Sequence, residues 1–262
     1  MTQNPYQPPS AGVSDPQLDA GGDGGFLGAP RKREAGAGIN WISDAWKLFT
    51  ANPGMWIVFL ILLFGISLVV QFIPLIGGLA QGLLMPILVG GIMMGCDSLR
   101  RGGSLEFDHL FAAFKTHAGP LLVVGAIYVV ASVVIMIIAL APFLGMVGLS
   151  IMTGGGAEQI DPAQLGGFFI GFLIAMLLLV PVMAAYWFAV PLVALNNVPP
   201  LEAMKLSFFG CLKNWLAFLI YGLVAMVIAF AASLPLMLGW LVAGPLFMAT
   251  IYTGYRDIYY EA

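Results

Sequence analysis

The feature of this sequence that most constrains its fold is a set of four long stretches without a single Asp, Glu, Lys or Arg. They run over 48–96, 116–157, 162–201 and 214–255, with lengths of 49, 42, 40 and 42 residues. A bilayer-spanning helix needs roughly 20 apolar residues. The whole chain is 60% hydrophobic and only 9% charged, against roughly 25% charged in soluble domains. This excludes an ordinary soluble enzyme, a disordered chain and a nucleic-acid-binding protein, and predicts an all-α polytopic membrane protein.

Breaks inside the first and last stretches predict a helical hairpin in each. The first is interrupted at Gln71–Pro74 and the last between Pro235 and Gly239. The two central stretches are interpreted as one long or kinked span each, although 116–157 could instead hold two short crossings broken at Pro142. The predicted helices lie near 55–73, 76–96, 119–143, 167–194, 215–234 and 239–256, within a transmembrane domain over 38–258.

The positions of Lys and Arg favour six helices and give an orientation. With six spans, all ten positive charges fall on one side of the membrane, and the opposite side carries only Glu158 and Asp161. Lys and Arg in short loops are retained on the cytoplasmic face. An extra crossing near 142–152 would move Lys205 and Lys213 outside. We therefore expect six spans in a bacterial inner membrane, with the N-terminus and residues 259–262 in the cytoplasm.

Residues 1–37 are predicted to form a disordered cytoplasmic tail. They are rich in Pro, Gly, Ala and Asp and lack a periodic apolar pattern that could be buried. We expect no cleavable signal peptide, because no apolar segment follows the start. The basic cluster Arg31–Arg33 near the end of the tail is interpreted as an orientation signal or as a contact with anionic headgroups.

Each positively charged loop leads into an amphipathic segment and then a spanning helix, which predicts three repeated modules. The first and third modules match over Asp44–Leu48 and Glu202–Leu206. Amphipathic helices beside a bilayer lie in its interface; docking of a cytoplasmic protein partner is the alternative. The candidate lipid or partner contacts are Arg31, Lys32, Arg33, Trp41, Trp46, Phe49, Phe107, Phe111 and Phe114.

Small residues recur along the second predicted helix. Gly78, Gly82, Gly91 and Gly95 follow a spacing close to four residues. Small side chains let helix backbones approach closely inside a membrane. These glycines are expected to pack helices within the monomer, with a homo-oligomer contact as the alternative.

No group of residues points to catalysis, a cofactor or a metal. His109 and His117 have no metal-ligand partner at usable spacing. Asp97 and Asp257 lie at equivalent ends of the second and sixth helices, and we expect each to pair with a nearby arginine, Asp97 with Arg100 and Asp257 with its neighbour in the chain. The spans hold no ionisable carboxylate, Lys, Arg or His at mid-depth, which argues against a proton-coupled carrier. We expect a protein that is not an enzyme.

Short motifs resemble those of uncharacterised six-helix inner-membrane proteins of Gram-negative bacteria. Asn4–Pro9 resembles a tail found on such proteins, and Trp187–Val193, Pro199–Pro200, Glu202–Ala203 and Ser207 look like a motif of their membrane domain. The same motif looks distantly like the membrane domain attached to some glycerophosphodiester phosphodiesterases. The resemblance covers roughly 38–258. It implies a fold and a membrane, with no catalytic residue to carry over.

Two functions follow as expectations. The first is a non-enzymatic membrane organiser that binds lipid or a protein partner through the amphipathic segments. The alternative is a transporter or channel for a small neutral or lipid-like solute, suggested by the internal repeat and by the prolines within the spans.

Overall fold

The computed structural model describes residues 25–74, 76–152 and 162–261, and these are helical apart from short connections and one isolated bridge between Phe26 and Tyr260. The predicted all-α polytopic class is confirmed. The helices are α1 (Ala37–Ala51), α2 (Pro53–Gln71), α3 (Gly77–Arg100), α4 (His109–Thr116), α5 (Ala118–Met152), α6 (Pro162–Trp187), α7 (Ala189–Asn196), α8 (Pro200–Lys213), α9 (Trp215–Ser233) and α10 (Trp240–Tyr259). Glu158, Asp161 and the motif Asn4–Pro9 lie outside the described residues.

Five helical segments in the described part of the chain are long and apolar enough to cross a membrane. They are Pro53–Gln71, Gly77–Arg100, Ala118–Gly148, Leu165–Asn196 and Trp215–Ser233. These segments correspond to the first five predicted spans. Helix α10 corresponds to the sixth predicted span, but its second half carries hydroxyl groups and the charged residues Arg256 and Asp257. The sixth span therefore stays a prediction.

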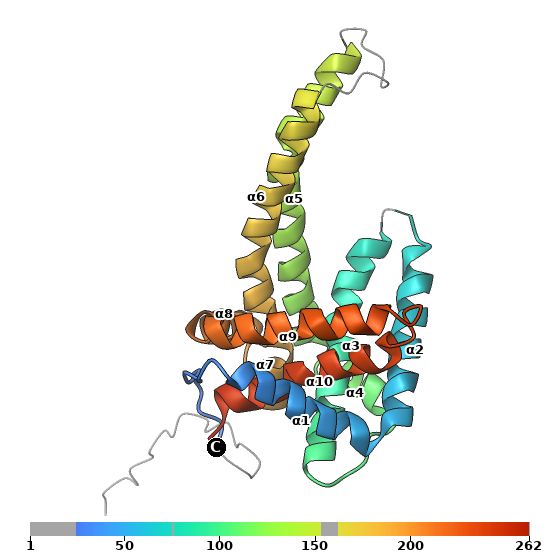
Figure 1. The fold of residues 1–262 in the computed structure, drawn as a ribbon, viewed down its shortest axis with the longest axis vertical. Helices are drawn as coiled ribbons and strands as arrows, with labels where there is room; N and C mark the ends of the chain where they lie inside the picture. Colours follow the sequence, from blue (N-terminus) through green and yellow to red (C-terminus); the bar gives the residue numbers. More distant parts are fainter. Residues whose placement is uncertain (1–24, 75, 153–161, 262) are drawn as a thin grey trace, which may run out of the picture.

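Two hairpins give the molecule its outline. Helices α5 and α6 form a long hairpin that extends away from the other helices, and α2 pairs with α3 in a shorter one (Figure 1). In the same view α9 and α10 run across the direction of α5 and α6. The core lies where α1, α3, α7 and α10 meet.

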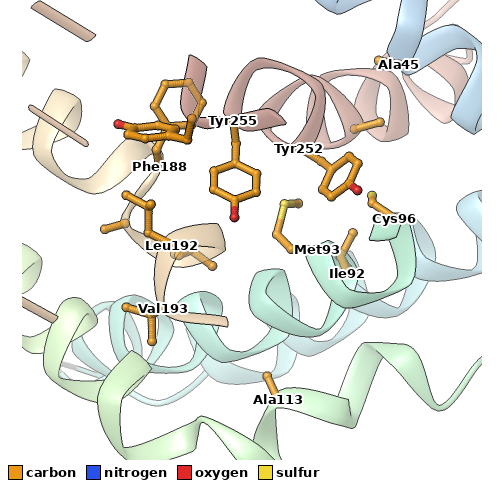
Figure 2. Close-up of a cluster of buried hydrophobic side chains, with 14 of the residues drawn as sticks. Ala45, Ile92, Met93, Cys96, Ala113, Phe188, Leu192, Val193, Tyr252 and Tyr255 are labelled. Carbon is orange, nitrogen blue, oxygen red and sulfur yellow. The ribbon is translucent and has the colours of Figure 1, made fainter. Parts of the chain in front are cut away.

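The centre of this core is built around aromatic side chains of α10. Tyr252 and Tyr255 are completely buried and point toward α3, where Met93 is also completely buried (Figure 2). A buried polar side chain needs hydrogen-bond partners. Asn196 at the end of α7 accepts a hydrogen bond from the Tyr255 hydroxyl and donates its amide to the Tyr260 hydroxyl at 2.9 Å.

Three short helices each end one residue before a long apolar helix begins. Asn52 separates α1 from α2, His117 separates α4 from α5, and Asn214 separates α8 from α9. At each break the backbone N–H bonds back to the preceding short helix, to Phe49, Ala113 and Cys211 respectively. The pattern of short helix, break and long helix is therefore found three times.

The residue at each break forms a hydrogen bond with the segment just before the next short helix, and the last break returns to the first short helix. Asn52 donates to the Leu105 carbonyl just before α4, at 3.2 Å. His117 Nε2 lies 2.7 Å from the side-chain oxygen of Asn197, just before α8. Asn214 accepts from the Arg33 backbone N–H at 2.6 Å, and Arg33 precedes α1. Each break thus holds the segment that leads into the next short helix, and the third returns to the first.

Helix packing follows the same order. Helix α4 packs against α3, α8 against α6, and α1 against α10, so each short helix lies on the last helix of the preceding module. This closed order is what a threefold internal repeat would produce, and the repeat itself remains a prediction.

The predicted packing glycines differ in what surrounds them. A Cβ atom at Gly91 would meet the backbone carbonyls of His109 and Leu110 in α4, and one at Gly95 would lie 2.5 Å from Leu105 Cδ1. A Cβ at Gly82 would meet the side chain of Val129 in α5. Gly78 has no such neighbour within 4 Å.

The segment 25–36 is ordered against the end of α10, although the sequence predicts a disordered tail through residue 37. The Leu27 N–H donates to the Tyr259 carbonyl at 2.9 Å, and the Arg31 N–H donates to the Ile258 carbonyl at 3.0 Å. Its partners are supplied by the far end of the chain, so no local pattern reveals this order.

Candidate functional site

An exposed aromatic cluster lies at the short helix α4, formed by Phe107 just before the helix and by Phe111 and Phe114 on it. These side chains are between 36 and 48% exposed, and their ring centroids follow one another at 5.8 and 6.3 Å. The opposite side of the helix is anchored, because Leu110 and Ala113 are completely buried. The helix is therefore held to the protein by one face, while two rings on the helix and the ring of Phe107 just before it are exposed.

Helix α1 is buried along one face and has an exposed aromatic at the edge of that face. Trp41, Ala45 and Phe49 are buried, and the Trp41 indole N–H donates to Asp257 at 2.8 Å. Trp46 lies beside Phe49, with ring centroids 5.5 Å apart, and is 48% exposed. Trp41 and Phe49 therefore pack inside the protein, away from a bilayer or a partner, and Trp46 is the exposed aromatic of this helix.

The basic cluster of residues 31–33 is mostly occupied within the molecule. The Arg33 guanidinium lies 2.8 Å from the Asp257 carboxylate, and Arg31 donates its Nε–H to the Asp257 carbonyl at 2.8 Å. Lys32 is exposed. Two of the three predicted headgroup contacts thus help to fix the N-terminal segment, which leaves Lys32 as the exposed cation of the cluster.

The carboxylates of Asp97 and Asp257 are held by hydrogen bonds and ion pairs. Asp97 pairs with Arg100 at 3.4 Å, as expected, and also with Arg101 at 2.6 Å, and it accepts from the Tyr252 hydroxyl at 2.8 Å. Asp257 pairs with Arg31 and Arg33, and the Arg256 guanidinium lies over the Tyr260 ring, 3.6 Å from its centroid. The expected pairing of Asp257 with Arg256 stays a prediction.

The side chains most often used in nucleophilic or acid–base catalysis also have structural partners. His109 Nδ1 accepts from the Glu106 backbone N–H at 3.0 Å, and His117 binds Asn197. Burial raises the pKa of the Cys211 thiol to about 12, although a hydrogen bond with Ser207 acts in the opposite direction. A thiol with such a pKa is protonated at neutral pH and is a poor nucleophile.

An apolar cavity of about 780 Å³ lies between α5, α6, α8 and α9. Its lining includes Tyr128, Val180, Ala184, Cys211, Trp215 and Phe218. Of the polar groups there, the Cys211 thiol donates to the Ala184 carbonyl at 3.5 Å and the Tyr128 hydroxyl to the Met183 sulfur at 3.8 Å. No sequence signal marks this cavity, because its lining comes from four separate helices and is almost entirely apolar.

Comparison with known proteins identifies a relative. The chain is 32% identical over 209 residues to a probable inner membrane protein of Burkholderia thailandensis, and the match covers 77% of each chain. The chain belongs to this family of probable inner membrane proteins. No protein-family model and no solved structure matches it.

Membership in this inner membrane protein family agrees with the five apolar helices and confirms the predicted location in the inner membrane. The orientation of the termini stays a prediction. The more distant resemblance to the membrane domain of glycerophosphodiester phosphodiesterases stays a prediction.

Proposed function

We propose that this inner membrane protein is a non-enzymatic organiser that binds lipid, or alternatively a protein partner, through the outer faces of α1 and α4. The observation that supports the proposal is the exposed aromatic cluster of α4, which protrudes from a helix whose other face is buried. Aromatic side chains on a short amphipathic helix insert at the boundary between headgroups and acyl chains. Trp46 on α1 adds a fourth exposed ring.

Replacing Phe111 and Phe114 by Ser tests the proposal. We expect the double variant to lose at least about 90% of the lipid or partner that co-purifies at this aromatic cluster. Each phenylalanine buried on binding contributes about 1.5–3 kcal/mol. Mass spectrometry of protein extracted in lipid nanodiscs measures what is retained. Phe209→Ser is the control, since Phe209 is 57% exposed but belongs to α8. Equal loss in the control, or none in the double variant, contradicts the proposal.

The alternative function is a transporter or channel for a small neutral or lipid-like solute. The observation in its favour is the apolar cavity, together with prolines inside α3, α5, α6 and α10. Solute flux across liposomes that contain the purified protein would support this alternative over the organiser.

We further propose six spans with both termini in the cytoplasm, because this topology places all ten Lys and Arg on one side. It requires α9 and α10, which run across α5 and α6 in Figure 1, to turn toward the membrane normal. In a cysteine-free background, Leu236→Cys between α9 and α10 is expected to react with a membrane-impermeant maleimide added outside the cell. Leu236 is 91% exposed. Ser104→Cys, in the loop before α4, is expected to react only after permeabilisation. If Leu236→Cys also reacts only after permeabilisation, then α9 and α10 do not cross the membrane.

A further inference from the structure

The cavity lies at one of the three junctions between modules, and at the other two junctions the helices pack directly against each other. Helix α3 packs on α5, and α10 packs on α2, so the last helix of one module meets the first long helix of the next. A Cβ atom at Gly125 of α5 would lie 2.7 Å from the Gly82 carbonyl of α3, which shows how closely that pair approaches. The equivalent pair, α6 and α9, meets at Trp187, the last residue of α6, whose ring centroid lies 6.0 Å from that of Phe218 and 6.3 Å from that of Tyr221. In the described residues the backbones of the two helices come close at few positions. We call this third junction the open seam.

The lining of the open seam suits hydrocarbon. Its volume is in the range of ordinary ligand pockets, about 300–1,000 Å³. Its lining is almost entirely apolar, and the Cys211 thiol and the Tyr128 hydroxyl already donate within the protein. A polar solute would therefore lose its hydration and find few partners. Val180, Leu212 and Trp215 line the seam and are 56 to 62% exposed. The cavity thus reaches the outer apolar surface, which in a membrane faces the acyl chains of the bilayer.

A cation lies on the helix that borders the seam. Lys205 is one turn before Phe208 on α8, and Phe208 lines the cavity. Lys205 is exposed and forms no ion pair with the described residues. An ammonium group near the interface attracts the phosphate of a lipid headgroup. By contrast, Lys213 at the end of the same helix donates to the Pro30 carbonyl at 2.9 Å.

We propose that the open seam between α6 and α9 holds the acyl chains of one phospholipid, with its phosphate near Lys205. The lipid takes the place of the helix contact that closes the other two junctions. This inference rests on the proposed function in that it names lipid as the ligand. It assigns the lipid to a surface separate from the aromatic cluster of α4.

The test compares two tryptophan substitutions at similarly exposed valines. Val180 on α6 lines the seam and is 62% exposed, whereas Val227 on α9 does not line it and is 68% exposed. The full-length protein is purified from nanodiscs of phosphatidylethanolamine and phosphatidylglycerol, and native mass spectrometry counts retained phospholipids. We expect one phospholipid in the seam of the wild type and of Val227→Trp, beyond any lipid held at the aromatic cluster of α4. We expect at least about tenfold less of this phospholipid on Val180→Trp, because the indole occupies space that the acyl chains would fill.

Lys205→Ala is expected to reduce retention of phosphatidylglycerol about fivefold, the effect of one basic residue near a lipid surface. Wild-type retention on Val180→Trp, or no phospholipid on the wild type, would overturn the inference. Lipid lost from the Phe111 and Phe114 double variant but kept by Val180→Trp would refute the open seam and leave the proposed function standing.

Discussion

Gly91→Ala is expected to destabilise the protein markedly, although alanine is the better helix former. The added methyl group would overlap the carbonyl oxygens of His109 and Leu110. These are backbone atoms of α4, so relief requires the whole short helix to move away from α3. Overpacking of this kind costs about 1–3 kcal/mol. Thermal unfolding in nanodiscs should show a lower midpoint.

The matched control for Gly91→Ala is Gly78→Ala in the same helix. Gly78 has open space where its Cβ would lie. Alanine there should be neutral or stabilise the helix by about 0.5–1 kcal/mol. If the two variants unfold at the same temperature, the close approach of α3 and α4 is not a determinant of stability.

Asp257→Asn is expected to loosen the N-terminal segment and lower stability by about 1–3 kcal/mol. The Asp257 side chain is only 21% exposed and accepts from Trp41 while pairing with Arg31 and Arg33. Asparagine preserves the shape but removes the charge, which leaves the two guanidinium groups without a carboxylate. Limited proteolysis after Arg31 or Arg33 should become faster, and the unfolding midpoint should fall.

Asp44→Asn is the control for this loss of charge. Asp44 pairs with Lys47 at 2.7 Å, but the two side chains are 54 and 75% exposed. Exposed pairs of this kind contribute little to stability, so the unfolding midpoint should hardly change. Rapid cleavage of this control at the N-terminal segment would show that proteolysis does not report on the contacts of Asp257.

The sequence predicted the helices well because their signal is local. Charge-free apolar stretches mark α2, α3, α5, α6 and α9, and the expected pair of Asp97 with Arg100 lies within one helical turn. The partners of Asp257 illustrate what local reasoning misses. Arg31 and Arg33 are more than 220 positions away along the chain, and their role as partners depends on how α1 meets α10.

The amphipathic segments of the candidate site were predicted, but which of their side chains are exposed was not. Trp41 and Trp46 lie on the same short helix, and both were expected to contact lipid or a partner. Helix α10 covers Trp41 and leaves Trp46 uncovered. Periodicity shows which residues share a face of a helix, whereas neighbouring helices decide which face is covered.

The packing of α1 on α10 has a consequence for how the protein is made. Domains are synthesised from the N-terminus onward, so α1 leaves the ribosome about 200 residues before its partner helix. Until α10 follows, Trp41, Arg31 and Arg33 lack the carboxylate of Asp257. A chain that stops before Trp240 can insert its earlier spans, yet its first helix keeps an uncovered apolar face and unpaired cations. The packing of the first helix is therefore completed only when the last helix has been made.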